Sequence, residues 1–166
     1  MKIERLVVGP IETNCYLLIN NDKCVIIDPG AEANMIIGHI FDNNLTPVGY
    51  LITHTHYDHI EGLDEIVEEF NIDLMEPNSE FNYEVIATPG HKEDCLSFYF
   101  KEENVLFSGD TLFKDTIGRV DLPGGCEETM MKTIELLKQL PDETVVYPGH
   151  GPSTTIEYEK ENNPWF

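Results

Sequence analysis

Three of the chain's six histidines, together with one aspartate, lie within the six residues from His54 to His59. Neutral imidazole and carboxylate groups are ligands that zinc, iron and manganese accept. Because a polar loop gives these side chains no packing role, the segment predicts a metal-binding loop. The alternative is a polar loop that is rich in histidine by coincidence.

Further candidate ligands follow predicted strands elsewhere in the chain. In α/β architecture the strands are rigid, and the short turns at their ends aim polar side chains at a common point. We therefore expect the histidine loop and three distant residues to meet at one edge of the sheets. The strands and the candidates that follow them are Gly49–Ile52 before His54, Glu84–Ala87 before His91, Val105–Phe107 before Asp110, and Val145–Tyr147 before His150.

A glycine directly precedes His91, Asp110 and His150, and glycine permits a sharp reversal of the backbone. Either histidine taken alone would suggest a hydrogen-bonded structural residue. Together with the histidine loop and Asp110, the ligand interpretation is favoured. The remaining histidine, His39, lies in a predicted helix without polar neighbours, and we assign it no role.

The geometry of the loop suggests two metal ions. In an extended stretch His54 and His56 point to the same side, whereas Asp58 and His59 follow as the chain turns toward a predicted helix. Each pair can therefore face its own ion. With the three distant candidates the chain offers seven ligands, more than one tetrahedral ion uses. A bridging carboxylate at Asp110 would let both ions reach four contacts.

The bulk composition predicts one domain that spans residues 1–166 and can bury its own core. The formal net charge of −21 would repel nucleic acid and anionic lipid, so neither is expected as a partner. The four cysteines are widely spaced, and we expect buried free thiols. The chain has no signal-peptide pattern and no apolar run of membrane-spanning length, which predicts a cytoplasmic protein.

Strand and helix patterns alternate along the chain, which indicates sheets covered by helices, an α/β sandwich. The predicted strands are Ile3–Val8, Cys15–Ile19, Cys24–Ile27, Gly49–Ile52, Glu84–Ala87, Leu96–Phe100, Val105–Phe107 and Thr144–Tyr147. The predicted helices are Ala31–Asn44, Glu61–Phe70, Glu127–Leu140 and Thr155–Asn162, and an irregular loop is expected from Lys114 to Cys126.

The chain resembles the metallo-β-lactamase superfamily nearly end to end. The resemblance rests on the histidine loop and on three further motifs, Pro89–His91, Ser108–Thr111 and Pro148–His150. Within the superfamily, the segments Asp110–Phe113, Ile117–Arg119 and Asp121–Gly125 resemble the single-domain, glyoxalase II-like hydrolases.

This resemblance implies a four-layer αββα sandwich that holds two divalent metal ions, most commonly zinc, with iron or manganese as alternatives. It implies hydrolysis of a small-molecule thioester or ester by a hydroxide held between the ions, with Asp58 as a catalytic residue. Asp28 matches the early Asp-x-Gly turn of the family and is implied to be structural. The implied ligands are His54, His56 and His91 for one ion, Asp58, His59 and His150 for the other, and Asp110 as the bridge.

The chain departs from the family pattern at positions that bear on the prediction of its substrate. Only 31 residues separate His59 from His91, where extra strands normally occur. Lys92 replaces a common threonine, and the sequence ends at Phe166, before the helical domain of full-length glyoxalase II. Glutathione specificity therefore does not carry over, and the oligomeric state is left open. Candidate substrate contacts are Arg119, Lys92 and Tyr57. Each has a simpler alternative: Arg119 could form an ion pair with Asp121, Lys92 could lie in solvent, and Tyr57 could have an ordinary packing role.

Two other functions fit the same residues. A mononuclear iron persulfide dioxygenase of this superfamily would use His54, His91 and Asp110 as a facial triad. An inactive module would bind metal without turnover. A nuclease of the ribonuclease Z type is disfavoured by the charge, and the flavodiiron proteins commonly place glutamate where His56 stands.

Overall fold

The computed structural model describes residues 1–166, which form two units, Met1–Glu80 and Phe81–Phe166. Each unit contains one larger β-sheet with its own helices and its own hydrophobic cluster. No helix in either unit combines the length and the apolar character needed to cross a membrane.

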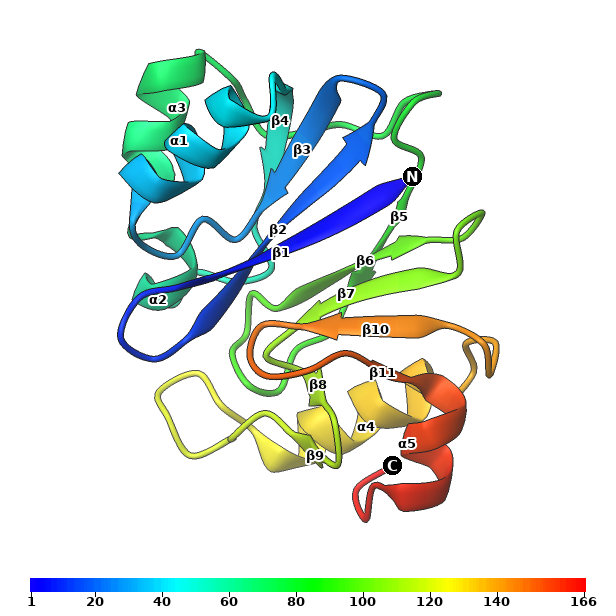
Figure 1. The fold of residues 1–166 in the computed structure, drawn as a ribbon. Helices are drawn as coiled ribbons and strands as arrows, with labels where there is room; N and C mark the ends of the chain where they lie inside the picture. The colour runs from blue at the N-terminus through cyan, green and yellow to red at the C-terminus, as the bar shows by residue number, and fades with distance from the viewer. The chain divides into compact units, whose positions relative to one another are not determined.

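The first unit contains a sheet of four strands in the order β1-β2-β3-β4 (Figure 1, blue to cyan). The pairs β1–β2 and β2–β3 are antiparallel, and β3–β4 is parallel because α1 provides the crossover between them. The strands are β1 Lys2–Val8, β2 Thr13–Asn20, β3 Lys23–Ile27 and β4 Thr46–Leu51. The helices are α1 Ala33–Asp42, α2 Tyr57–Ile60 and α3 Leu63–Phe70.

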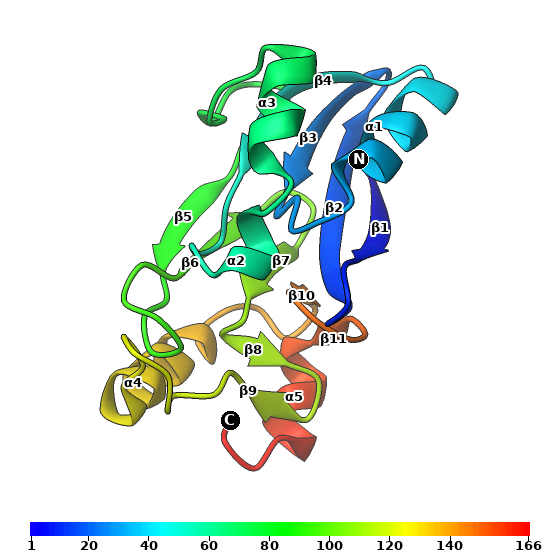
Figure 2. The ribbon, with the colours of Figure 1, turned by 90° about the vertical axis from the view of Figure 1, so that its left-hand side faces the viewer.

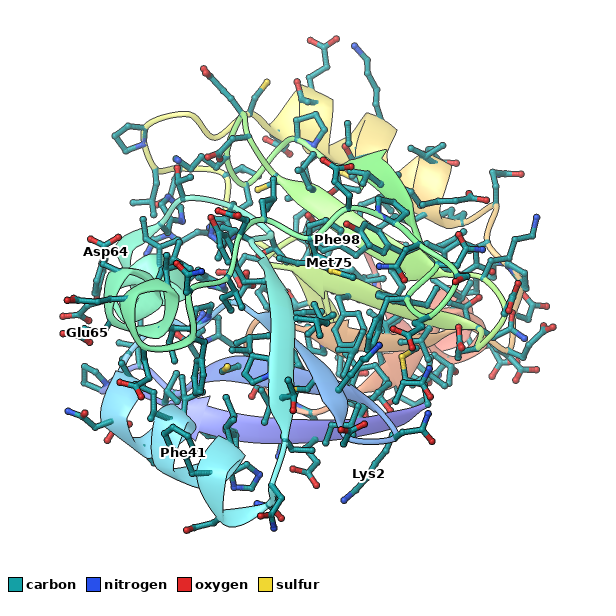
Figure 3. All side chains as sticks on the ribbon, turned by 90° about the horizontal axis from the view of Figure 1, so that it is seen from above. Lys2, Phe41, Asp64, Glu65, Met75 and Phe98 are labelled. Atoms are coloured by element: carbon teal, nitrogen blue, oxygen red, sulfur yellow. The ribbon has the colours of Figure 1, made fainter.

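Helices α1 and α3 pack on one face of this sheet. Leu17 of β2 lies opposite Ile26 of β3, and both belong to the same buried cluster as Ile36 of α1 and Ile66 of α3. At the far end of α1, the ring of Phe41, labelled in Figure 3, lies 5.6 Å from the ring of Phe70. The alternation of inward residues on strands and the helix spacing of Ile36 and Ile40 explain why these segments adopt these elements.

The second unit contains a sheet of five strands in the order β11-β10-β7-β6-β5 (Figures 1 and 2). Only β7 and β10 are parallel, and a two-stranded sheet, β8–β9, lies between them in sequence. The strands are β5 Glu84–Ala87, β6 Leu96–Phe100, β7 Val105–Gly109, β8 Leu112–Phe113, β9 Thr116–Ile117, β10 Val145–Pro148 and β11 Thr154–Thr155. The helices are α4 Glu127–Leu137 and α5 Ile156–Asn162.

Three side chains in register across this sheet, Tyr99, Leu106 and Val146, form the surface on which the helices pack. Ile134 of α4 and Ile156 of α5 are fully buried in the same cluster. Met130, Ile134 and Leu137, which recur at helix spacing in α4, are therefore core residues.

Every predicted strand and helix is present, but the sequence reading missed several short elements. The stretch expected to be an irregular loop, 114–126, contains β9, which pairs with β8 in a short hairpin. The chain also turns into helix α2 at Tyr57, earlier than the helix start expected at Glu61. These elements contain only two to four residues, too few for hydrophobic periodicity to reveal them.

Candidate metal centre

Strand direction brings two of the predicted ligands of the second unit to the same edge of its sheet. Strands β7 and β10 are parallel neighbours, with Pro148 opposite Gly109, so Asp110 and His150 emerge next to each other. The N–H of Gly149 donates to the carbonyl oxygen of Gly109 at 2.9 Å and holds the two strand ends together. The expected placement of ligands at strand ends therefore holds for this pair.

Asp110 lies between two histidines of its unit. Its Oδ2 is 3.6 Å from Nε2 of His91 and 3.6 Å from Nε2 of His150. Asp110 and His91 are buried, whereas the side chain of His150 is 26% exposed. One carboxylate oxygen thus lies at equal distance from two imidazole nitrogens.

A backbone carbonyl orients His91. Nδ1 of His91 lies 2.8 Å from the carbonyl oxygen of Arg119, so this nitrogen carries the proton and Nε2 has the lone pair. Gly118 makes this contact possible because a Cβ at this position would lie 1.8 Å from the carbonyl oxygen of Asp110. Glycine is therefore required where the β9 segment passes directly against the ligand-bearing turns.

In the first unit, His54 and His56 form one close pair of potential ligands. Nε2 of His54 lies 3.0 Å from Nδ1 of His56, and the two rings meet edge to face with centroids 4.7 Å apart. The predicted extended stretch explains the pairing, because residues two apart in an extended chain point to the same side.

Asp58 and His59 form the second pair, at the start of α2. Oδ2 of Asp58 lies 3.3 Å from Nε2 of His59, and it also accepts a hydrogen bond from the hydroxyl of Thr13 at 3.0 Å. His59 is fully buried. The pair depends on a close backbone approach, since a Cβ on Gly30 would lie 1.6 Å from the carbonyl oxygen of Asp58.

A buried carboxylate, Asp28, supports the loop from behind. It is 2% exposed, and its Oδ2 lies 2.9 Å from Nδ1 of His59. Its two oxygens also accept hydrogen bonds from the backbone N–H and the hydroxyl of Thr53, at 2.7 and 2.6 Å. Asp28 therefore orients His59 and fixes Thr53, in agreement with the structural role implied by the family resemblance.

The donor atoms fit divalent metal ions in chemistry and spacing. Two nitrogen or oxygen ligands of a tetrahedral zinc ion, each about 2.0–2.1 Å from the metal, lie about 3.4 Å apart. The donor pairs within the units are separated by 3.0, 3.3, 3.6 and 3.6 Å. Both units therefore contain histidine and aspartate side chains that could bind a metal ion.

Two of the three candidate substrate contacts form ion pairs in the structure. Arg119 forms a two-point ion pair with Asp121, both contacts at 2.7 Å, which raises the pKa of the guanidinium and lowers the pKa of Asp121 to about 2. Lys92 pairs with Asp94 at 2.9 Å. Tyr57 is 62% exposed, so the packing role considered for it is wrong. For Arg119, Lys92 and Tyr57, a substrate role stays a prediction.

Sequence reasoning missed the residues that orient the ligands. Thr13 gives no sequence signal, because it lies on a distant strand. The contribution of Arg119 to His91 is a backbone carbonyl, which any residue possesses, so its side chain gives no signal for this contact. Only Thr53 had a detectable signal, namely its position directly before His54. His39, to which no role was assigned, lies 2.6 Å from a carboxylate oxygen of Glu4 at the surface.

Comparisons with known proteins identify close relatives. The family model described as the metallo-beta-lactamase superfamily matches residues 8–83 and 75–150. A probable metallo-hydrolase of Bacillus subtilis, YqgX, is 37% identical, with 99% of this chain and 97% of the relative covered. The hydroxyacylglutathione hydrolase GloC of Haemophilus influenzae is 34% identical over 99% of this chain and 98% of its own length.

The same comparisons agree with the shortened interval after His59. The alignment with the Bacillus subtilis protein extends over 205 positions, although the chain has 166 residues, so the relative contains residues that this chain lacks. The two matched stretches of the family model overlap at residues 75–83.

The fold comparison confirms the predicted architecture. The crystal structure of the BLEG-1 B3 metallo-beta-lactamase superposes with a TM-score of 0.93 and 33% identity, covering 99% of both chains. The predicted α/β class with a metallo-β-lactamase fold is therefore confirmed. With the family match over most of its length and a full-length relative at 37% identity, this chain belongs to the metallo-β-lactamase superfamily.

Proposed function

We propose that this member of the superfamily is a metal-dependent hydrolase that cleaves a thioester or ester bond of a small-molecule substrate. The observation that carries the proposal is the position of Asp110 Oδ2, 3.6 Å from a nitrogen of each of two histidines. A carboxylate oxygen with this spacing suits a site of two metal ions. The name of the Haemophilus influenzae relative, a hydroxyacylglutathione hydrolase, supports a thioester as the substrate.

The proposed ligand assignment follows the donor pairs. Each pair of the first unit would supply two ligands to one ion, and the second unit would add one histidine to each ion together with the shared aspartate. Zinc suits this set of nitrogen and oxygen donors, while iron and manganese accept the same ligands. The proposed ligands are His54, His56 and His91 for one ion, Asp58, His59 and His150 for the other, and Asp110 for both.

Bound divalent ions would lower the pKa of water toward ~7 and polarise the acyl carbonyl group. Asp58 is the residue that we assign to proton transfer. Its carboxylate is fixed by the hydroxyl of Thr13 at 3.0 Å, so it cannot rotate freely. A carboxylate held in this way can orient a water molecule, accept a proton from it, and return that proton to the departing thiolate or alkoxide.

The ligand pairs favour this proposal over the persulfide dioxygenase. A mononuclear iron site with a facial triad would need only His54, His91 and Asp110. The close pair Asp58–His59, at 3.3 Å, and the approach of His150 to Asp110 would then have no role. A second ion gives all of these groups a function.

Metal analysis and substrate assays test the proposal together. Zinc-loaded protein is expected to contain two metal equivalents per chain and to hydrolyse a hydroxyacylglutathione thioester or a simple ester. Chelation should abolish turnover, and added zinc should restore it. A β-lactam belongs in the same panel because of the likeness to a B3 enzyme.

Two histidine variants provide a matched comparison. His150→Ala should remove one metal equivalent and lower kcat/KM by more than about 100-fold, since even the loss of a residue that only orients a ligand costs about 10–100-fold. His39→Ala, which changes a surface histidine paired with Glu4, should alter neither quantity. One iron per chain with sulfur-dependent oxygen uptake would contradict the hydrolase. Metal binding without turnover across the panel would indicate an inactive metal-binding module.

A further inference from the structure

Thr53 connects the buried carboxylate of Asp28 to the first histidine of the loop. The residue lies between the end of β4 and His54, and it is 2% exposed. Its backbone N–H donates to Oδ1 of Asp28 at 2.7 Å. Its hydroxyl oxygen lies 2.6 Å from Oδ2 of Asp28 and 3.2 Å from Nδ1 of His54.

The number of hydrogens on these groups determines the direction of each bond. A threonine hydroxyl has a single hydrogen, and a carboxylate oxygen can only accept. The hydroxyl of Thr53 therefore donates to Asp28, and it must accept from Nδ1–H of His54. In this tautomer, Nε2 of His54 has the lone pair, and Nε2 is the nitrogen that lies 3.0 Å from His56.

The carboxylate of Asp28 also contacts His59, with no side chain between them. Oδ2 of Asp28 lies 2.9 Å from Nδ1 of His59, which places a proton on Nδ1 and leaves Nε2, the nitrogen next to Asp58, as the metal-binding nitrogen. Asp28 thus contacts one histidine of each ligand pair, His59 directly and His54 through a hydroxyl group.

We propose that Thr53 is a positioning residue that lets one buried carboxylate select the metal-binding nitrogen of both His54 and His59. The hydroxyl of Thr53 serves the His54 side alone, because the contact of Asp28 with His59 does not involve it. The consequence for metal binding rests on the proposed function, whereas the choice of tautomer does not.

The tautomer can be measured in the metal-free protein by 1H–15N NMR of the imidazole rings. The wild type is expected to show His54 and His59 protonated at Nδ1. Thr53→Val keeps the shape of the side chain but removes the hydroxyl, so His54 should lose its single tautomer while His59 keeps it. Thr53→Ser retains a hydroxyl and should restore the wild-type pattern.

Zinc titration against a competing chelator gives the second readout. Thr53→Val should weaken one of two zinc sites by about 10–100-fold and leave the other unchanged, as expected when the residue that orients a ligand is lost. Thr53→Ser should bind both ions as the wild type does. A role in stability alone would lower the unfolding midpoint without a selective loss of one site.

Two results would overturn the proposal: a wild-type His54 protonated at Nε2, or a folded Thr53→Val protein with the wild-type tautomer and both affinities intact. The wild-type spectrum decides the question even where the valine variant does not fold. If the wild type binds no zinc, the proposed function fails, and the tautomer measurement still tests the role of Thr53 separately.

Discussion

Gly118→Ala is expected to destabilise the second unit strongly, because the new methyl group has no space. An added Cβ would lie 1.8 Å from the carbonyl oxygen of Asp110 and 3.2 Å from Cβ of His91, whereas real Cβ atoms do not approach closer than 3.0 Å. The contact is with backbone, which cannot rotate away as a flexible side chain can. The segment around residue 118 must therefore move away from Asp110.

The cost has two parts. Overpacking of this kind costs about 1–3 kcal/mol. The movement would also break the hydrogen bond from Gly118 N–H to the carbonyl oxygen of Thr111, at 3.1 Å, and the contact of His91 with the carbonyl of Arg119, at 2.8 Å. At about 1 kcal/mol for each bond, the free energy of unfolding should fall by about 3–5 kcal/mol.

Urea denaturation measures this loss. With a slope of about 2 kcal/mol per molar urea, a loss of 4 kcal/mol lowers the unfolding midpoint by about 2 M. The only tryptophan, Trp165, lies in the same unit and provides a fluorescence signal for it, and circular dichroism follows the whole chain.

A second glycine, Gly38, provides a control for which the expected change in the free energy of unfolding has the opposite sign. Gly38 lies inside α1, and a Cβ there would meet nothing within 4 Å outside the helix's own backbone. Gly38→Ala should therefore raise the free energy of unfolding by up to about 1 kcal/mol through helix propensity. A Gly118→Ala protein with the wild-type midpoint would refute the steric reasoning, as would equal effects of the two substitutions.

Three further predictions concern other parts of the second unit. Glu159, fully buried, accepts hydrogen bonds from three partners, so Glu159→Ala should lower the free energy of unfolding by about 3 kcal/mol or more in the same urea assay. Cys126 is exposed, and hydrogen bonds from Thr129 lower its pKa, so a thiol reagent should modify this one cysteine rapidly in the folded protein and all four only after denaturation. Asp121 has a pKa of about 2 beside Arg119, so its ion pair should persist above that pH and be lost as the pH falls through it; a carboxyl NMR titration midpoint near 4 would contradict this.

The exposure of Cys126 also corrects an expectation. All four cysteines were expected to be buried, which holds for Cys15, Cys24 and Cys95. Burial raises the pKa of Cys24 and of Cys95 to about 12, so these thiols are unreactive at neutral pH. Cys126 differs because it is the N-cap residue of α4, a position at the helix end that no apolar pattern marks.

The sequence by itself determined the strands and longer helices, the family, and the types of ligand that the chain can offer. These features are local: hydrophobic periodicity reports which face of an element is buried, and the spacing of His54 and His56 reports that they share a side. The predicted single domain, the choice of zinc and the cytoplasmic location stay predictions.

Tertiary structure alone decided how the ligands are oriented. The carbonyl of Arg119 on His91, the hydroxyl of Thr13 on Asp58, and the contact of Asp28 with His59 each join residues at least 28 positions apart. No periodicity encodes such contacts, and a backbone carbonyl is chemically the same at every residue. The side chains that bind a metal can be read from their types, but the groups that fix their tautomers are defined only once the chain has folded.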